Sequence, residues 1–362
     1  MSIRTFYKRY EHHINALAFI GGFIFDMLAL QRIDHLLSQV LLTLWLGSAG
    51  AAIVFHSVVY REMARATFFG KIIDWVSAVL PFFIQFALGA ILSGSLVFFS
   101  RSASLAISWP FLVLIVLFIV GNEVFRSRYV SLAFQVVAFY VAAFLYATLF
   151  IPLLIKSVGP EAFVVSGVVS FVLFLFMLWS LRTVARARYK ESRILMWVGM
   201  VLFTLVFSGL YFKNMIPPLP LFLEEIGIYH SVTRDDLGNY TMTYEPAPRF
   251  SLSAVNATYH LGNSGVAYAF SSVFAPQGIR TTIVHEWSRY DTSSDRYVVL
   301  HRISFPLVGG REGGYRGYSV KQSISEGKWR VDVMTDSGKL IGRTNFVVVA
   351  GAPPTPLETR IQ

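Results

Sequence analysis

The sequence predicts an all-α membrane bundle of seven transmembrane helices, followed by a soluble, all-β, antiparallel sandwich-like domain. Hydrophobic residues make up 55% of the 362-residue chain and charged residues only 14%, well below the roughly 25% of ordinary soluble domains. Long apolar runs continue to Phe212, whereas short alternating segments begin at Tyr240. Pro217, Pro218 and Pro220 separate the two patterns and predict the end of the last helix.

The net charge of +10 is unevenly distributed. Most of the excess lies between the apolar runs before Lys213, and the remainder of the chain is nearly neutral. This distribution is typical of topology signals and argues against a nucleic-acid partner. The absence of cysteine excludes disulfides, thiolate nucleophiles and Cys-ligated metal sites, and no motif indicates a cofactor.

Seven apolar runs approach or exceed the length that a bilayer requires. They are Ile14–Leu30, His35–Tyr60, Ile72–Phe99, Ala103–Val120, Val130–Ile155, Ala162–Leu181 and Ile194–Phe212. The first lacks a cleavage pattern of small residues nearby, so we expect a retained signal anchor. Pro81 is expected either to kink the third run or to separate a short interfacial helix from it.

The orientation follows from the cations in the connecting loops. With seven spans, the N-terminus and the alternate loops on its side hold 13 Lys and Arg residues, and the opposite side holds four. Because short basic loops stay in the cytoplasm, the N-terminus is expected inside. An odd number of spans then places the C-terminal domain on the extracytoplasmic side.

Three intramembrane polar residues are candidates for function, namely Asp26, Gln85 and Gln135. In an enzyme or transporter they would line a cavity, since polar groups inside a membrane often mark a substrate path. The alternatives are a hydrated interfacial carboxylate for Asp26 and hydrogen bonds between helices for the two glutamines.

The C-terminal half shows the period-two alternation of strands. Leu221–His230 is expected to form a short helix, because Glu224 and Glu225 suit a first helical turn. The expected strands are Tyr240–Tyr244, Val266–Phe274, Ile279–Tyr290, Arg296–Phe305, Tyr315–Gln322, Trp329–Met334 and Leu340–Val349. The expected domains are 1–212 (helices), 213–249 (proline-rich hinge and connector), 250–350 (sandwich) and 351–362 (flexible tail).

Short motifs in this half carry a resemblance. They are Val273-Phe274-Ala275-Pro276, His285-Glu286-Trp287, Gly309-Gly310-Arg311, Gly314-Tyr315-Arg316-Gly317-Tyr318-Ser319-Val320-Lys321 and Gly327-Lys328-Trp329-Arg330-Val331. With Ile216–Leu221 and Ile228–His230, the region up to Val349 resembles a bacterial domain of unknown function found at the C-terminus of multi-span membrane proteins. The resemblance implies a fold and a bacterial envelope setting, and implies no activity or catalytic residue. Together with the orientation given by the loop charges, it leads us to expect a multi-pass protein of the bacterial inner membrane with a cytoplasmic N-terminus and a periplasmic C-terminal domain.

Six residues form a candidate ligand-binding face: Arg311, Tyr315, Arg316, Tyr318, Lys321 and Arg330. Arginine binds anions through two parallel hydrogen bonds, and tyrosine stacks while offering a hydroxyl. The alternative is a glycine-rich hairpin followed by a strand whose solvated face happens to be basic.

A metal site is not expected. His285 and His301 lie on consecutive expected strands and are predicted to sit nearly opposite each other. Alternation points the neighbouring Glu286 to the other face, so the ligand set stays incomplete. Trp287 and Trp329 are expected in the core.

These observations favour a non-enzymatic membrane protein that presents a binding module. Its partners would be membrane lipids and, at the module, an envelope protein or an anionic lipid or glycan; the oligomeric state is left open. The alternative is a membrane enzyme or transporter for lipid-linked or glycan substrates, with the sandwich as an accessory domain.

Overall fold

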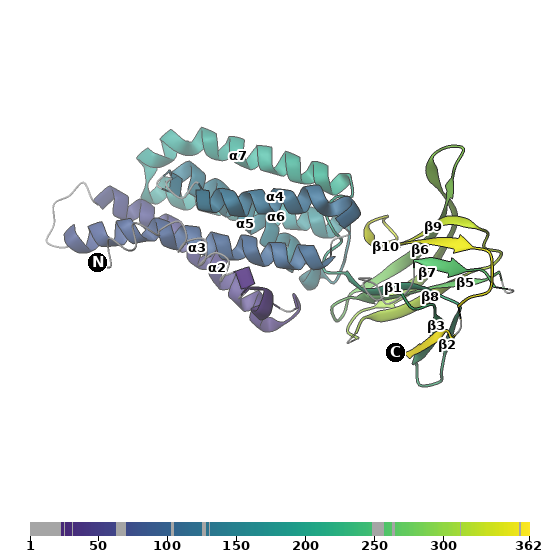
Figure 1. The fold of residues 1–362 in the computed structure, drawn as a ribbon. Helices are drawn as coiled ribbons and strands as arrows, with labels where there is room; N and C mark the ends of the chain where they lie inside the picture. Colours follow the sequence, from purple (N-terminus) through teal and green to yellow (C-terminus); the bar gives the residue numbers. More distant parts are fainter. Residues whose placement is uncertain are drawn as a thin grey trace, which may run out of the picture. The chain divides into compact units, whose positions relative to one another are not determined.

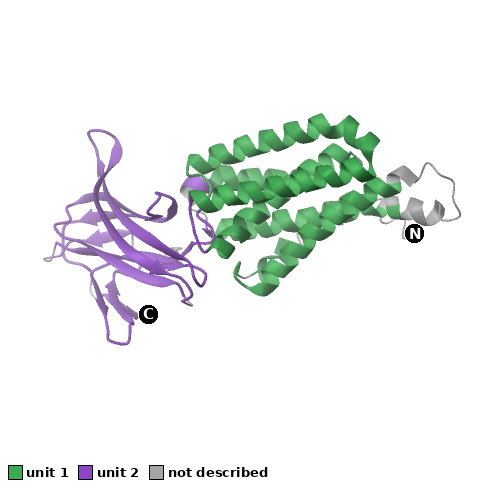
Figure 2. Ribbon diagram, turned by 180° about the vertical axis from the view of Figure 1, so that it is seen from behind, with its two compact units in different colours: residues 1–101, 109–155, 160–216 green, residues 102–108, 156–159, 217–362 purple. Residues whose placement is uncertain are grey.

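A computed structural model describes residues 23–24, 26–30, 32–62, 70–102, 105–124, 128–129, 131–247, 257–262, 265–311, 313–354 and 356–362. The chain divides into two compact units (Figure 2). The helical unit ends at Ile216, and the sheet unit comprises Pro217–Gln362 with the short segments Ser102–Ser108 and Lys156–Gly159. The proline segment that was expected to act as a spacer therefore belongs to the sheet unit.

Six long helices form the described part of the helical unit (Figure 1). They are α2 (Leu36–Glu62), α3 (Gly70–Ser102), α4 (Leu105–Val124), α5 (Leu132–Ile155), α6 (Pro160–Val184) and α7 (Arg186–Phe212). Each contains at least 18 residues apolar enough to cross a bilayer. The chain thus has the helices of a multi-pass membrane protein.

These helices correspond to six of the seven expected spans. Most of the other expected span, Ile14–Leu30, lies outside the described residues. Helix α3 continues through Pro81, so this proline does not separate a short interfacial helix.

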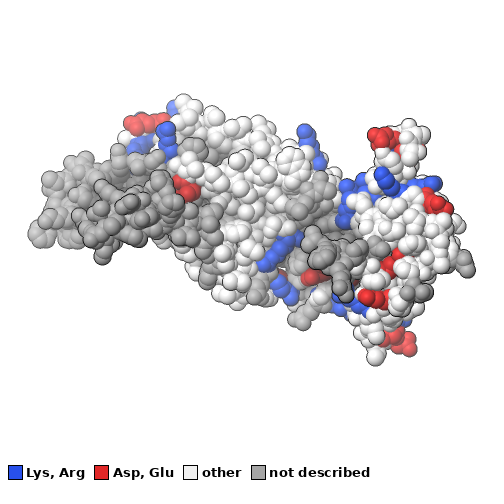
Figure 3. Space-filling model, viewed as in Figure 1, with Lys and Arg blue, Asp and Glu red and all other residues white. Residues whose placement is uncertain are grey.

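Helix α5 is the most enclosed of the six. Of its apolar window 72% is buried, against 22% for α4 and 28% for α7. Close contacts hold its neighbours: the Ser166 hydroxyl of α6 donates to the Ala147 carbonyl of α5 at 3.1 Å, and Gly199 of α7 leaves room for Val137. On the face shown in Figure 3, the middle of the helical unit carries few charged side chains, as a lipid-facing surface requires.

The described part of the sheet unit contains three sheets. The strands are β1 (Phe222–Tyr229), β2 (Ser231–Arg234), β3 (Tyr240–Tyr244), β4 (Thr258–His260), β5 (Ala267–Phe274), β6 (Arg280–Asp291), β7 (Arg296–Val308), β8 (Tyr315–Lys321), β9 (Gly327–Thr335), β10 (Leu340–Val349) and β11 (Glu358–Ile361). Their orders are β1-β5-β8, β4-β10-β9-β6-β7 and β11-β3-β2. Pairing is antiparallel except between β4 and β10, so the five-stranded sheet is mixed.

The three-stranded sheet β1-β5-β8 is packed on both sides. Towards the five-stranded sheet, Ala269 of β5 shares a core with Trp287 and Trp329, both of which are buried as expected. On the other side, Phe270 of β5 packs against Met242 and other residues of the β11-β3-β2 sheet. Because successive side chains of β5 point to opposite faces of the sheet, neighbouring residues lie in these two separate cores.

Most expected strands are present, with small differences at their ends, but the expected helix at Leu221–His230 is wrong. This segment forms β1, which pairs antiparallel with β5 over most of its length. Ile228 points into the core shared with the five-stranded sheet, and Tyr229 into the opposite one. Two buried faces with period two favour a strand over a helix, whatever the local preference of the two glutamates.

The expected loose tail is also wrong in part. Glu358–Ile361 forms β11 and pairs with β3. The Arg360 guanidinium makes an ion pair with Glu225 at 3.0 Å, which fixes the strand to β1. The region expected as a connector likewise contains β1, β2 and β3.

Candidate ligand-binding face

Strand β8 carries four of the six residues predicted to form a basic, aromatic face. Because side chains alternate, Arg316 and Tyr318 lie on the face towards the β11-β3-β2 sheet, and Tyr315 and Lys321 on the face towards the five-stranded sheet. Tyr315 packs against a core cluster. Lys321 is only 9% exposed, and its ammonium donates to the Gln322 carbonyl at 3.0 Å. The four residues therefore do not share one surface.

Arg330 belongs to the five-stranded sheet, apart from β8. Its guanidinium carbon lies 4.4 Å from the centroid of the Tyr297 ring, and its Nε is 3.5 Å from Asp332 Oδ2. Both oxygens of Asp332 accept hydrogen bonds from Arg343, at 2.6 and 2.8 Å. Arg330 is thus part of a local network of charges and aromatic rings rather than of the β8 surface.

Arg311 and Arg316 do lie near each other. Partial burial, followed by the charge of Arg311, lowers the pKa of Arg316. Among the described residues neither arginine has an ion-pair partner, and the buried Nε of Arg316 makes no hydrogen bond. Glu225, whose charge reaches Arg316, already binds Arg360 and accepts from Tyr229. Within the described residues, therefore, no anion pairs with either of the two cations.

A glycine loop passes beside Arg316. Gly313 and Gly314 have φ of +72° and +77°, which an L side chain rarely adopts. The Ser272 hydroxyl donates to the Gly313 carbonyl at 2.6 Å and holds the loop against β5. A Cβ atom on Gly313 would lie 3.7 Å from Arg316 Nη2, so at this position the loop presents backbone to the guanidinium.

The hairpin of β2 and β3 adds two residues that sequence reasoning missed. The Tyr240 hydroxyl donates to the Arg316 carbonyl at 3.3 Å, and its ring centroid is 6.2 Å from that of Tyr318. The Arg234 guanidinium carbon lies 5.6 Å from the Tyr240 ring. We call these five residues, Arg234, Tyr240, Arg311, Arg316 and Tyr318, the arginine–tyrosine face. The hairpin is more than seventy residues from β8, and no local signal links them.

The prediction that His285 and His301 lie opposite each other is wrong. His301 pairs with Trp287, and His285 pairs with Ile303. A register shift follows directly after Trp287, where Leu300 has no partner on β6. The two imidazoles therefore differ in surroundings: one is fully buried and the other is exposed.

His285 instead joins a buried hydrogen-bonded cluster. Its Nδ1 and Nε2 lie 2.8 Å from the hydroxyls of Ser319 and Ser271, and the Trp287 indole donates to Ser319 at 2.9 Å. Because Ser319 accepts from the indole, its own proton is available to Nδ1 of a neutral imidazole. Burial lowers the pKa of His285 to about 3. No member of this cluster is exposed enough to reach a substrate, so its role is structural.

A second histidine cluster surrounds Glu245. Its carboxylate lies 2.9 Å from His230 Nε2 and 2.8 Å from His260 Nδ1, and it accepts from the His260 amide at 2.7 Å. Burial opposes the charged form, but these hydrogen bonds lower the pKa of Glu245 overall. Among the described residues no group of His, Asp and Glu has the arrangement of a metal site.

The intramembrane glutamines are hydrogen-bonded between elements. The Gln135 amide nitrogen lies 3.0 Å from His56 Nδ1 and also donates to the Tyr129 carbonyl. The Gln85 amide donates to Glu123 at 3.0 Å. These contacts connect α5 with α2 and α3 with α4, which is the role that polar side chains commonly have in bundles.

Asp26 lies away from Gln85. The Leu30 amide donates to the Asp26 carbonyl at 2.8 Å, and Arg101 donates to the Leu30 carbonyl at 2.8 Å. Leu30 also packs against Gly94, which is about 14 Å along α3 from Gln85 at the usual helical rise. The described residues thus do not show the cavity that would join Asp26 to the glutamines in an enzyme or transporter.

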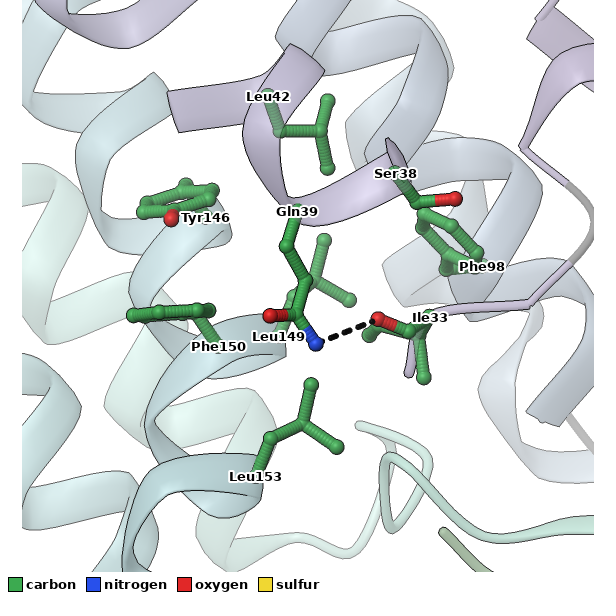
Figure 4. Close-up of a pocket in the computed structure, with 9 residues that line it drawn as sticks. All are labelled: Ile33, Ser38, Gln39, Leu42, Phe98, Tyr146, Leu149, Phe150 and Leu153. Atoms are coloured by element: carbon green, nitrogen blue, oxygen red, sulfur yellow. Dashed lines mark hydrogen bonds between the residues drawn. The ribbon is translucent and has the colours of Figure 1, made fainter. Parts of the chain in front are cut away.

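One pocket in the helical unit lies between α2, α3 and α5 (Figure 4). Its lining is mainly apolar and consists of Ile33, Ser38, Gln39, Leu42, Phe98, Tyr146, Leu149, Phe150 and Leu153. The Gln39 amide donates across it to the Ile33 carbonyl at 3.3 Å. None of the three predicted intramembrane residues lines this pocket.

The sheet unit matches a known family. Residues 280–348 match the family described as "Protein of unknown function (DUF2914)". This agrees with the expected domain of unknown function in the C-terminal region, over a shorter range than the expected Ile216–Val349. No curated protein matches the chain.

A solved structure matches with little similarity. It is the Pseudomonas fluorescens alkylpurine DNA glycosylase AlkC bound to DNA containing an abasic site analog, which is 9% identical. The match covers 86% of this chain and 99% of that chain, with a TM-score of 0.22.

Proposed function

We propose that this chain is an integral protein of the bacterial inner membrane that binds an envelope component and catalyses no reaction. Seven spans would hold a periplasmic β-sandwich, whose ligand would be an envelope protein, an anionic lipid or an anionic glycan. The observation that carries the proposal is the arginine–tyrosine face, where Arg311 and Arg316 have no anionic partner among the described residues. Uncompensated, adjacent guanidinium groups are typical of anion-binding surfaces.

Two further observations support this reading. The β1-β5-β8 sheet and the five-stranded sheet share buried clusters, as the two layers of a sandwich do. The excess of Lys and Arg on one side of the expected spans favours a cytoplasmic N-terminus and a C-terminal unit outside the cytoplasm.

The test is a binding assay with the full-length protein in uncharged lipid nanodiscs. The probes are vesicles with anionic lipid, envelope glycans and envelope proteins crosslinked in cells. The double variant Arg311→Ala/Arg316→Ala is expected to bind its ligand at least about tenfold more weakly, because each lost charge-assisted contact is worth about 1.5–3 kcal/mol.

The matched control is Arg280→Ala/Arg296→Ala, which removes the same charge from two exposed arginines elsewhere in the sheet unit. It is expected to change affinity by less than about twofold, as isolated surface charges usually do. If both double variants lose the same affinity, the loss is due to the change in net charge, and the arginine–tyrosine face is not the binding site.

A further inference from the structure

The charge of the arginine–tyrosine face restricts the anion that suits it. The Gly314 amide donates to the Arg311 carbonyl at 3.3 Å, so a tight turn separates Arg311 from Arg316. Burial first, and then the charge of Arg311, lowers the pKa of Arg316. One carboxylate would balance only half of their charge. A phosphate monoester carries about −1.5 to −2 at pH 7, which matches both guanidinium groups together.

The surroundings of Arg316 also suit a tetrahedral group. Its Nε is buried, so the terminal nitrogens are left for a ligand, and Nη2 lies beside the backbone of Gly313. A phosphate has three oxygens for such donors, and arginine can contact two at once. The Tyr240 hydroxyl donates to the Arg316 carbonyl and is positioned to fix this part of β8.

Tyr318 and Arg234 complete the surface. Tyr318 lies two residues after Arg316 on the same face of the sheet and is 37% exposed. Its hydroxyl can donate to a third phosphate oxygen. Arg234 adds a third cation, whose guanidinium carbon lies 5.6 Å from the centroid of the Tyr240 ring.

We infer that the arginine–tyrosine face binds a phosphate dianion, supplied either by a lipid headgroup as a phosphate monoester or as free inorganic phosphate. This inference rests on the proposed binding function and narrows its ligand to one chemistry. Arg311 and Arg316 hold the phosphate oxygens, Tyr318 donates a further hydrogen bond, and Tyr240 is a positioning residue.

The experiment compares anions on the full-length protein in uncharged nanodiscs. The soluble probes are inorganic phosphate, sulfate and acetate, followed by calorimetry. The lipid probes are vesicles containing phosphatidic acid, a monoester, or phosphatidylglycerol, a diester, at equal mole fraction. At pH 7.5 inorganic phosphate is expected to bind at least about tenfold more tightly than acetate, or phosphatidic acid at least about tenfold more tightly than phosphatidylglycerol. Whichever of the two binds is expected to bind about tenfold more weakly to Arg311→Ala/Arg316→Ala.

Two variants and one pH titration distinguish specific binding of a phosphate dianion from non-specific electrostatic attraction of any anion. Arg316→Lys keeps the charge but loses the planar fork, so affinity should still fall several-fold. Tyr318→Phe should cost about threefold. Because the second pKa of a phosphate monoester is about 6, binding should weaken between pH 7.5 and 5.5, whereas acetate binding should not.

The outcomes distinguish the two proposals. If phosphatidic acid vesicles bind and free phosphate does not, the source is a lipid, and the reverse identifies the free ion. Equal binding of monoester and diester vesicles through the arginine pair would overturn the phosphate inference and keep the binding function. If no lipid, glycan, protein or ion probe depends on this pair, both proposals fail.

Discussion

At the scale of single residues, His285 shows how a polar group is accommodated in the sheet core. Two serine hydroxyls and a tryptophan surround it, and the side chain is fully buried. An imidazole in this position is stable while neutral, since a buried charge without an anion is costly. Protonation should therefore act against folding.

The lowered pKa of His285 determines the direction in which the stability of the sheet unit changes with pH. The pKa of His285 falls from 6.5 to about 3 on folding, so below pH 6.5 the unfolded state binds a proton that the folded state does not. Its contribution to stability is complete above pH 6.5 and declines towards pH 3, by up to about 1.4 kcal/mol per pH unit. Between pH 7.5 and 5 we expect a loss of about 2 kcal/mol in the sheet unit. Proteolysis of the full-length protein in a urea series measures it.

His301 offers the control for this measurement, because it is an exposed histidine on the neighbouring strand. His285→Gln should remove most of the decline with pH, and His301→Gln should leave it unchanged. A decline of the same size in both variants would assign it to other groups.

Sequence reasoning can select residues that are close in the chain. Arg311 and Arg316 stand out in a glycine-rich stretch, where the Gly314 amide donates to the Arg311 carbonyl at 3.3 Å. Arg234 and Tyr240 could not be found in this way, because only the packing of a distant hairpin brings them to β8. Tyr315 and Lys321 were misplaced for a different reason: their strand has two faces, and a motif does not indicate which one is buried.

At the scale of elements, alternation and turn residues located most strands. The errors arose where strand pairing, which the local sequence does not show, determines whether a segment is a strand or which residues lie opposite each other. β1 lacks any strand signal stronger than its two glutamates, and its partner β5 lies about forty residues further along the chain. The histidine register failed because the pairing that starts at Asp291 and Arg296 would already place His285 opposite Arg302, and one unpaired residue on β7 moves its partner on to Ile303. A bulge of this kind has no reliable sequence signature.

Close packing of α5 and α7 gives an element-scale prediction. A Cβ atom at Gly199 would lie 2.5 Å from Val137 Cγ2, so Gly199→Ala forces the helices apart and should cost about 1–3 kcal/mol. Gly209 on the same helix has nothing within 4 Å of its ideal Cβ. Gly209→Ala should be neutral or gain up to about 1 kcal/mol in helix propensity. Thermal unfolding in detergent compares the two.

A double variant tests the stated cause. Val137→Ala removes the clashing methyl groups, so in its presence Gly199→Ala should lose most of its effect. Additive effects of the two substitutions would show that the glycine matters for another reason.

At the scale of the whole molecule, the chain combines two units that obey different rules. The helices expose apolar side chains such as Leu205, Phe176 and Val168, which only a lipid environment tolerates over so large an area. The sheets bury theirs between layers, as a domain in water does. The sequence predicted this division, because the long apolar runs end near Phe212 and the excess of Lys and Arg ends near the same point. Beyond it, apolar residues alternate with a period of two.

The central claim of the account is that the sheet unit lies outside the cytoplasm, where an envelope ligand can reach it. The chain has no cysteine, so single cysteines can report its sides without background. Leu237, 88% exposed in the β2–β3 hairpin, and Glu191, exposed near the start of α7, are suitable positions. With a membrane-impermeant maleimide on intact spheroplasts, we expect Leu237→Cys to be labelled, and Glu191→Cys only after lysis. Labelling of Glu191→Cys with protection of Leu237→Cys would contradict the account.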